Sequence, residues 1–158
     1  MKVRNFLAMM TIALCATGMV SCSDDDDDPA SSELVQGNYV GTNVLKVGGQ
    51  EMPSENNVAK IIPQSGDMVT VALPQAPAET KAGMEMPAIA IKDVKLVEVG
   101  QGTYTFSVDT IDVVTGEMHI VGKGMSGEVK GNKLTLKYNF KPGKMPMYID
   151  GSFEGVKK

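Results

Sequence analysis

The sequence contains no tryptophan, a single histidine and only two cysteines, and its last arginine is Arg4. Without arginine the chain lacks the fork-shaped donor that suits phosphate and carboxylate clamps, so we expect no nucleic-acid partner. Both cysteines, Cys15 and Cys22, lie in an N-terminal apolar region. The sequence after Cys22 therefore offers neither a thiol nucleophile nor a thiolate metal site.

The single histidine also limits catalysis. A Ser/His/Asp triad would need His119 as its base, yet no serine stands in a Gly-x-Ser-x-Gly elbow. Asp109 and Asp112 form the kind of carboxylate pair that glycosidases use, but Asp112 flanks a predicted turn, where acids are usually solvated. Met118 precedes His119, and strand alternation places the two on opposite faces, which argues against a copper site. We expect no enzyme activity, no cofactor and no metal.

The N-terminus has the pattern of a secretory signal. Lys2 and Arg4 precede an apolar stretch from Phe6 to Val20, which is too short to span a bilayer. Met19-Val20-Ser21-Cys22 resembles the lipobox of bacterial lipoproteins, with Met where Leu is usual. This resemblance implies that residues 1–21 are a signal peptide, that Cys22 carries acyl chains, and that the membrane is a partner.

An acidic segment follows the lipobox. Residues 22–33 include five consecutive aspartates, Asp24 to Asp28, and no large apolar side chain after Cys22, so we expect a disordered tether. Such a tether is a solvated spacer, and its resemblance to the tether of Bacteroidetes-type surface lipoproteins implies a compatible second role, as a signal for display outside the outer membrane. Residues 34–158 hold thirteen acids and thirteen lysines, so the predicted domain is neutral.

From Leu34 onward the pattern predicts β-structure. Short runs of alternating apolar and polar residues are separated by turn residues such as Gly48-Gly49 and Gly131-Asn132. Apolar residues change phase around Lys92-Asp93, which predicts a bulge there. The expected strands are 38–47, 58–62, 68–73, 88–99, 103–111, 117–130, 133–140 and 147–156, with loops at 74–87 and 141–146.

About eight antiparallel strands would leave two exposed edges if the sheet stayed open. Closure into one barrel removes both edges, and an eight-stranded barrel is either filled by side chains or holds one small ligand. A two-sheet β-sandwich has the same sequence signature and remains the alternative.

Several motifs resemble those of the calycin-like β-barrel lipoproteins of Bacteroidetes. They are Gly37-Asn38-Tyr39-Val40-Gly41, the Gly-Asn-Lys-Leu-Thr-Leu hairpin at 131–136 and the closing segment 145–155, all after a lipobox. The resemblance covers residues 34–158. It implies that Tyr39 takes the place of a tryptophan that closes one barrel end in the wider calycin group, which commonly binds small apolar molecules.

Two functions remain open. The first is a cell-envelope binding module for a small apolar or amphiphilic ligand, which an interior cavity above roughly 300 Å³ would favour. The second is a displayed scaffold that docks to another envelope protein through loops 74–87 and 141–146. Eight methionines after Cys22 could pack barrel rims or line a pliable ligand mouth. The inward candidates for ligand contact are Tyr39, Val71, Leu73, Ile89, Ile91, Tyr104, Phe106, Leu134, Leu136 and Tyr138.

Overall fold

A single antiparallel sheet makes up most of the computed structural model, which describes residues 28–76 and 87–158. Cys22, the predicted signal peptide, most of the predicted acidic tether and most of the predicted loop 74–87 lie outside these residues. The elements are α1 (Ser31–Val35), β1 (Gly37–Val47), β2 (Gln50–Pro63), β3 (Met68–Gln75), β4 (Ala90–Lys95), β5 (Val97–Gly100), β6 (Thr103–Val108), β7 (Ile111–Thr115), β8 (Met118–Lys130), β9 (Lys133–Pro142) and β10 (Ile149–Lys157).

The predicted hairpin turns are confirmed. Gly48 and Gly49 have φ of 58° and 90°, and Gly131 has φ of 60°, which is the left-handed region that tight two-residue turns require. These turns fix the register on either side, with Val47 opposite Gln50 and Lys130 opposite Lys133.

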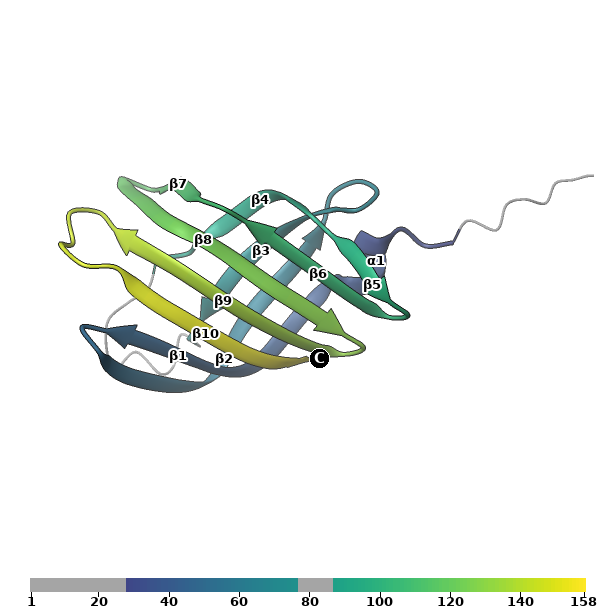
Figure 1. The fold of residues 1–158 in the computed structure, drawn as a ribbon, viewed down its shortest axis with the longest axis horizontal. Helices are drawn as coiled ribbons and strands as arrows, with labels where there is room; N and C mark the ends of the chain where they lie inside the picture. Colours follow the sequence, from purple (N-terminus) through teal and green to yellow (C-terminus); the bar gives the residue numbers. More distant parts are fainter. Residues whose placement is uncertain (1–27, 77–86) are drawn as a thin grey trace, which may run out of the picture.

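The sheet curls until its two edges meet. Its strand order is β4-β3-β2-β1-β10-β9-β8-β6-β5, with β7 also paired to β8. The terminal strands β4 and β5 are separated in the chain by Leu96 alone, so the two edges must be adjacent. In Figure 1, β8, β9 and β10 lie in front of β2 and β3. The single curled sheet supports the barrel and not the sandwich.

The seam of the barrel is not a strand ladder. Within the two described ranges no backbone pairing joins β4 to β6 or β7, although β4 contacts both strands. A side-chain bond crosses the gap, where Thr115 Oγ1 donates to the carbonyl of Ala88 at 2.9 Å.

The predicted number of strands was too low, since the described residues form ten. The expected strand 88–99 is divided at Leu96, whose amide donates to Asp67 of a neighbouring turn at 2.8 Å. The expected strand 103–111 ends at Val108, and β7 begins at Ile111. The bulge at Lys92-Asp93 is confirmed, because these two residues between Ile91 and Val94 face the single residue between Val69 and Val71.

The helix α1 closes one end of the barrel. Val35 and Ser32 are buried, and the Tyr39 hydroxyl donates to the carbonyl of Val35 at 2.7 Å. Residues 31–33, assigned from the sequence to the tether, therefore belong to the ordered part. The α1 end of the barrel comprises α1, the turn 64–67, β5 and the turn 131–132. No helix in the described part of the chain is long and apolar enough to cross a membrane.

The opposite end of the barrel carries the turns 48–49, 116–117 and 143–148. Ile149 and Phe140 are buried at this end, but a set of nine other apolar side chains there is exposed or half-buried against the core. We call this set the distal rim, and it comprises Leu45, Val47, Met52, Val108, Val113, Met118, Met145, Met147 and Tyr148.

Candidate functional site: a filled barrel with an apolar distal rim

The structure places all ten predicted inward residues in one core. Each is at most 6% exposed. A cavity large enough for a ligand would leave the side chains around it accessible to a water-sized probe, so these values describe an interior filled by its own side chains. The ten residues come together as predicted, and their side chains pack against one another in the described core.

Glycines opposite aromatic rings explain the filling. Gly151 is the cross-strand partner of Tyr138, and Gly127 is the partner of Phe106. A Cβ at either glycine would collide with the ring opposite it. Because the two glycines have no side chain, the aromatic rings opposite them have room inside the barrel. The few aromatic residues therefore suffice to fill it.

A polar pair lies inside this apolar core. The Tyr138 hydroxyl donates to Asn43 Oδ1 at 2.7 Å, and both residues are buried. Burial raises the pKa of Tyr138, and the bond to Asn43 opposes the rise only in part. The Asn43 amide nitrogen has no hydrogen-bond partner among the described residues.

The distal rim concentrates methionine. Met52, Met118 and Met147 are exposed there, and Met145 packs half-buried against the core. The rim positions agree with the prediction that methionines pack barrel rims. Among the described methionines, Met125 is instead part of the buried core.

Lysines flank the rim beside its one aromatic ring. The Lys123 ammonium lies 4.7 Å from the ring centroid of Tyr148, and that of Lys141 lies 5.5 Å away. These cation–π contacts hold an exposed tyrosine and two positive charges together. The rim can therefore contact a surface that is both apolar and acidic.

His119 pairs with Asp112, which the sequence analysis did not foresee. The His119 Nε2 atom lies 2.7 Å from Asp112 Oδ1, and both side chains are exposed. The pair spans the β7–β8 hairpin, whose register could not be derived from the sequence. The adjacent hollow of about 670 Å³ is lined by His119 together with Thr115, Lys141 and Lys144, and by no serine.

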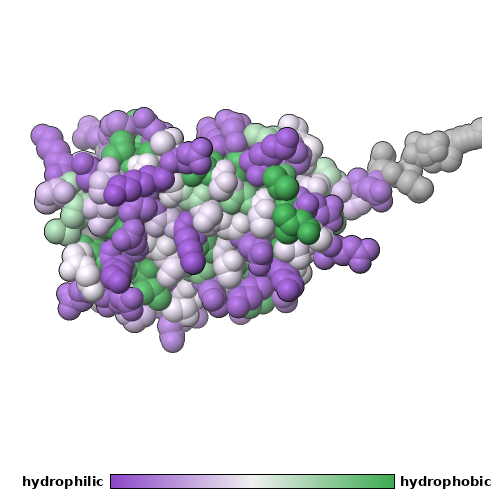
Figure 2. Space-filling model, viewed as in Figure 1, coloured by the Kyte–Doolittle hydropathy of each residue, from purple (hydrophilic) through white to green (hydrophobic). Residues whose placement is uncertain are grey.

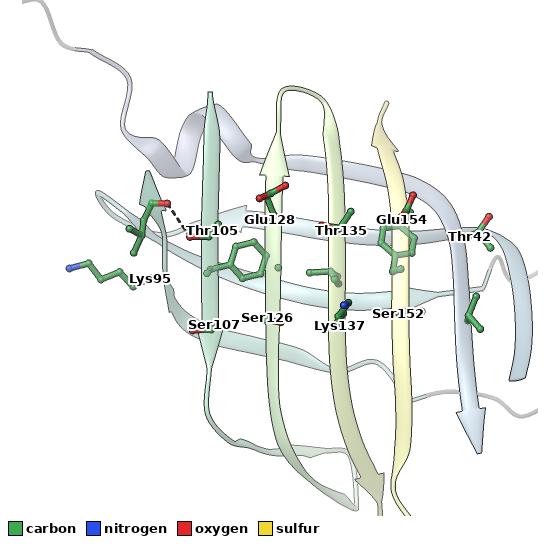
Figure 3. Close-up of a pocket in the computed structure, with 16 residues that line it drawn as sticks. Thr42, Lys95, Thr105, Ser107, Ser126, Glu128, Thr135, Lys137, Ser152 and Glu154 are labelled. Atoms are coloured by element: carbon green, nitrogen blue, oxygen red, sulfur yellow. Dashed lines mark hydrogen bonds between the residues drawn. The ribbon is translucent and has the colours of Figure 1, made fainter. Parts of the chain in front are cut away.

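An open groove lies on the outer face of the sheet. It measures about 1100 Å³, is open to solvent, and crosses β1, β10, β9, β8 and β6. Figure 3 shows two parallel rows of its polar side chains. The first row is Thr105, Glu128, Thr135, Glu154 and Thr42, and the second is Ser107, Ser126, Lys137 and Ser152.

A second groove of about 850 Å³ continues the first and shares Lys137 with it. Both have hydroxyls and mixed charges on their walls, which are the ordinary solvent-facing side of alternating strands. Neither offers an apolar ligand an enclosed site. Over residues 28–76 and 87–158 no group of three or more His, Cys, Asp or Glu side chains could hold a metal ion.

The fold and its core define a small, filled antiparallel β-barrel. The chain belongs to the calycin-like beta-barrel domain family, whose model matches residues 35–156. This confirms the family indicated by the motifs at 37–41, 131–136 and 145–155.

One solved structure shares the fold, the crystal structure of a candidate outer membrane protein from Bacteroides fragilis. The TM-score is 0.66 at 23% sequence identity, over 80% of this chain and 52% of that chain. This chain therefore spans about half the length of that protein. Among curated proteins none matches the chain.

Proposed function

We propose that the protein is an exported lipoprotein of the outer membrane, anchored through Cys22, whose barrel is a non-catalytic binding module. The lipobox at 19–22 supports the anchor. Membership of the calycin-like family supports a binding role. The outer-membrane name given to the Bacteroides fragilis protein of like fold supports the location.

The filled interior supports binding at the outer surface of the module. Because the ten inward residues are each at most 6% exposed, the partner binds the outer surface of the barrel. The distal rim is the surface best suited to this, because methionine and tyrosine adapt to an apolar partner. Lys123 and Lys141 beside Tyr148 add attraction for acidic groups. The partner is an envelope protein with an apolar, acidic docking face.

Site-specific cross-linking tests this docking. A photo-cross-linking residue at Tyr148 in intact cells should give one adduct of discrete mass. The adduct should disappear when Met52 and Met118 are both replaced by Asp, because charge on the rim opposes burial. The matched control is Ser126→Asp on the outer groove, which should leave the adduct unchanged. An adduct insensitive to the rim substitutions would contradict docking there.

A small apolar or amphiphilic ligand at the distal rim is the second candidate function. The half-buried Leu45, Val47, Val108, Val113 and Met145 favour it, because they extend the apolar core to the surface at one end only. A ligand reaching deeper would have to displace core side chains. Uptake of an environment-sensitive apolar dye separates the two candidates.

The anchor is tested by Cys22→Ala, which should move the protein from the membrane fraction to the soluble fraction. Acylation contributes about 0.8 kcal/mol per buried methylene, so two or more chains hold a protein stably on the membrane and their loss releases it.

Replacing Asp24 to Asp28 with Ala should leave membrane attachment intact and reduce cleavage of the protein by protease added to whole cells. Membrane-bound Cys22→Ala protein would contradict the anchor, and unchanged cleavage would leave the aspartates a spacer.

A further inference from the structure

Exposed apolar side chains also gather at the α1 end. Leu34 of α1 is 48% exposed, and Val97 and Val99 of β5 are 52% and 59% exposed. All four residues of β5 are exposed, so neither face of this strand is covered by the barrel. Figure 2 shows one hydrophobic patch at the end of the barrel where α1 lies, and further patches at the opposite end.

The helix and the strand are held at this end by one turn. The Ser32 amide donates to the carbonyl of Gly66 at 3.3 Å, and the Leu96 amide donates to the carbonyl of Asp67 at 2.8 Å. Since Gly66 and Asp67 are adjacent, α1 and the start of β5 flank the same turn. Figure 1 shows α1 and β5 at the same end of the barrel.

The sequence connects this end to the anchor. Cys22 precedes Ser31, the first residue of α1, by nine residues. A fully extended chain spans at most about 3.6 Å per residue, so the segment between Cys22 and Ser31 can span at most about 30 Å. An acyl anchor at Cys22 therefore holds the α1 end within about 30 Å of the lipid surface, whereas it sets no such limit on the distal rim directly.

We propose that the α1 end docks on the membrane through Leu34, Val97 and Val99, so that the barrel stands on the bilayer with its distal rim facing away. This inference rests on the proposed acylation of Cys22. Apolar side chains near an interface gain by entering the boundary between headgroups and acyl chains. The anchor supplies the proximity, and the exposed valines and leucine determine which surface is in contact.

The absence of tryptophan makes a direct test available. Val99→Trp places one fluorophore on β5, and Val114→Trp places one at a site on β7 that is 70% exposed, near the distal rim. Both sites are exposed, so both variants should melt within a few degrees of the unmodified protein. The acylated full-length proteins are reconstituted into phosphatidylcholine vesicles, which avoid repulsion between anionic lipids and Asp24 to Asp28.

On reconstitution, Val99→Trp should shift its emission to shorter wavelength and be quenched by brominated lipid. Val114→Trp should show neither change and remain open to aqueous iodide. Leu34→Trp is a second reporter and should behave as Val99→Trp does, which guards against a local effect of one substitution.

The outcomes separate the docking from the anchor. Proteins that float with the vesicles while Val99→Trp and Leu34→Trp remain unquenched by lipid overturn the docking and leave the anchor standing. Proteins that fail to float overturn both. A blue shift of Val99→Trp in detergent that grows with protein concentration assigns β5 to an interface with a second copy, and this also overturns membrane docking.

Discussion

At the residue scale, the Tyr138–Asn43 pair is a polar contact enclosed by apolar side chains. Tyr138→Phe should lower the free energy of unfolding by about 1–3 kcal/mol, because it leaves the Asn43 oxygen buried without a donor. Chemical denaturation measures the loss. The matched control is Tyr148→Phe, which removes an exposed hydroxyl and should change stability by no more than about 0.5 kcal/mol.

A double-variant cycle isolates the bond. Adding Asn43→Leu to Tyr138→Phe removes the stranded acceptor, so the double variant should lose less stability than the two single variants together. Strictly additive losses would show that the hydroxyl and the amide do not depend on each other.

Tyr39 makes the free energy of unfolding depend on pH in the alkaline range. Burial raises its pKa from 10.0 to about 12, so in the folded protein the hydroxyl keeps its proton where the unfolded chain loses it. The contribution of Tyr39 is therefore complete below about pH 10, falls as the pH rises towards 12, and is constant above that. The raised pKa of Tyr138 acts in the same direction.

Tyr39→Phe separates this effect from the titration of lysines, which both proteins share. The difference in unfolding free energy between the unmodified protein and Tyr39→Phe should shrink between pH 10 and 12 in urea titrations. A difference that stays constant across this range would mean that Tyr39 ionises equally well in both states.

Which residues face inward was predictable from alternation alone, because strand side chains have a period of two. All ten inward predictions lie in the core. That they fill the core could not be predicted in the same way. The filling depends on which residues are paired across strands, such as Gly151 with Tyr138 and Gly127 with Phe106. The pattern of residues within one strand does not predict these cross-strand pairs.

At the scale of the strands, Gly41 controls the pairing of β1 with β10. A Cβ at Gly41 would collide with the backbone carbonyl of Glu154 on the partner strand, and a paired strand cannot move aside as a side chain can. Gly41→Ala should therefore lower stability by about 1–3 kcal/mol or more, measured as a shift in the denaturation midpoint.

Gly100→Ala is the matched control, because an added Cβ there meets nothing within 4 Å. It should be neutral or slightly stabilising, since alanine has less backbone freedom to lose on folding. Equal losses from the two substitutions would mean that the close approach of β1 to β10 is not what requires glycine at position 41.

The strand boundaries show where local pattern stops being informative. Turn glycines predicted the hairpins at 48–49 and 131–132 because a positive φ is a local requirement. The division at Leu96 has a tertiary cause, the bond from its amide to Asp67. The short helix α1 was missed for a similar reason, since Ser31–Val35 is held by contacts with Gly66 and Tyr39.

At the scale of the whole molecule, the two ends of the barrel are chemically different. The α1 end is closed by a helix and lies near Cys22 in sequence, whereas the distal rim carries methionines and is flanked by lysines. The motifs predicted the family, and the family match over 35–156 confirms it. The contrast between the ends needed the structure, because it arises from turns distant in sequence that the curled sheet brings together.

The interior provides the final prediction, which decides between docking and ligand uptake. Leu136 is buried at 1% exposure in the centre of the filled core. If the barrel is filled, an environment-sensitive apolar dye should not enter the unmodified protein, and Leu136→Trp should lower stability by about 1–3 kcal/mol through overpacking. If core side chains move to admit a ligand, the dye should bind and fatty-acid-like competitors should displace it. Leu136→Trp should then abolish uptake with little change in melting temperature.

The control is Val114→Trp, a comparably large addition on the exposed surface, which should alter neither dye binding nor melting temperature. Dye bound by the unmodified protein and blocked by Leu136→Trp would falsify the filled barrel, because only a space beside Leu136 lets one added ring exclude a ligand without straining the fold.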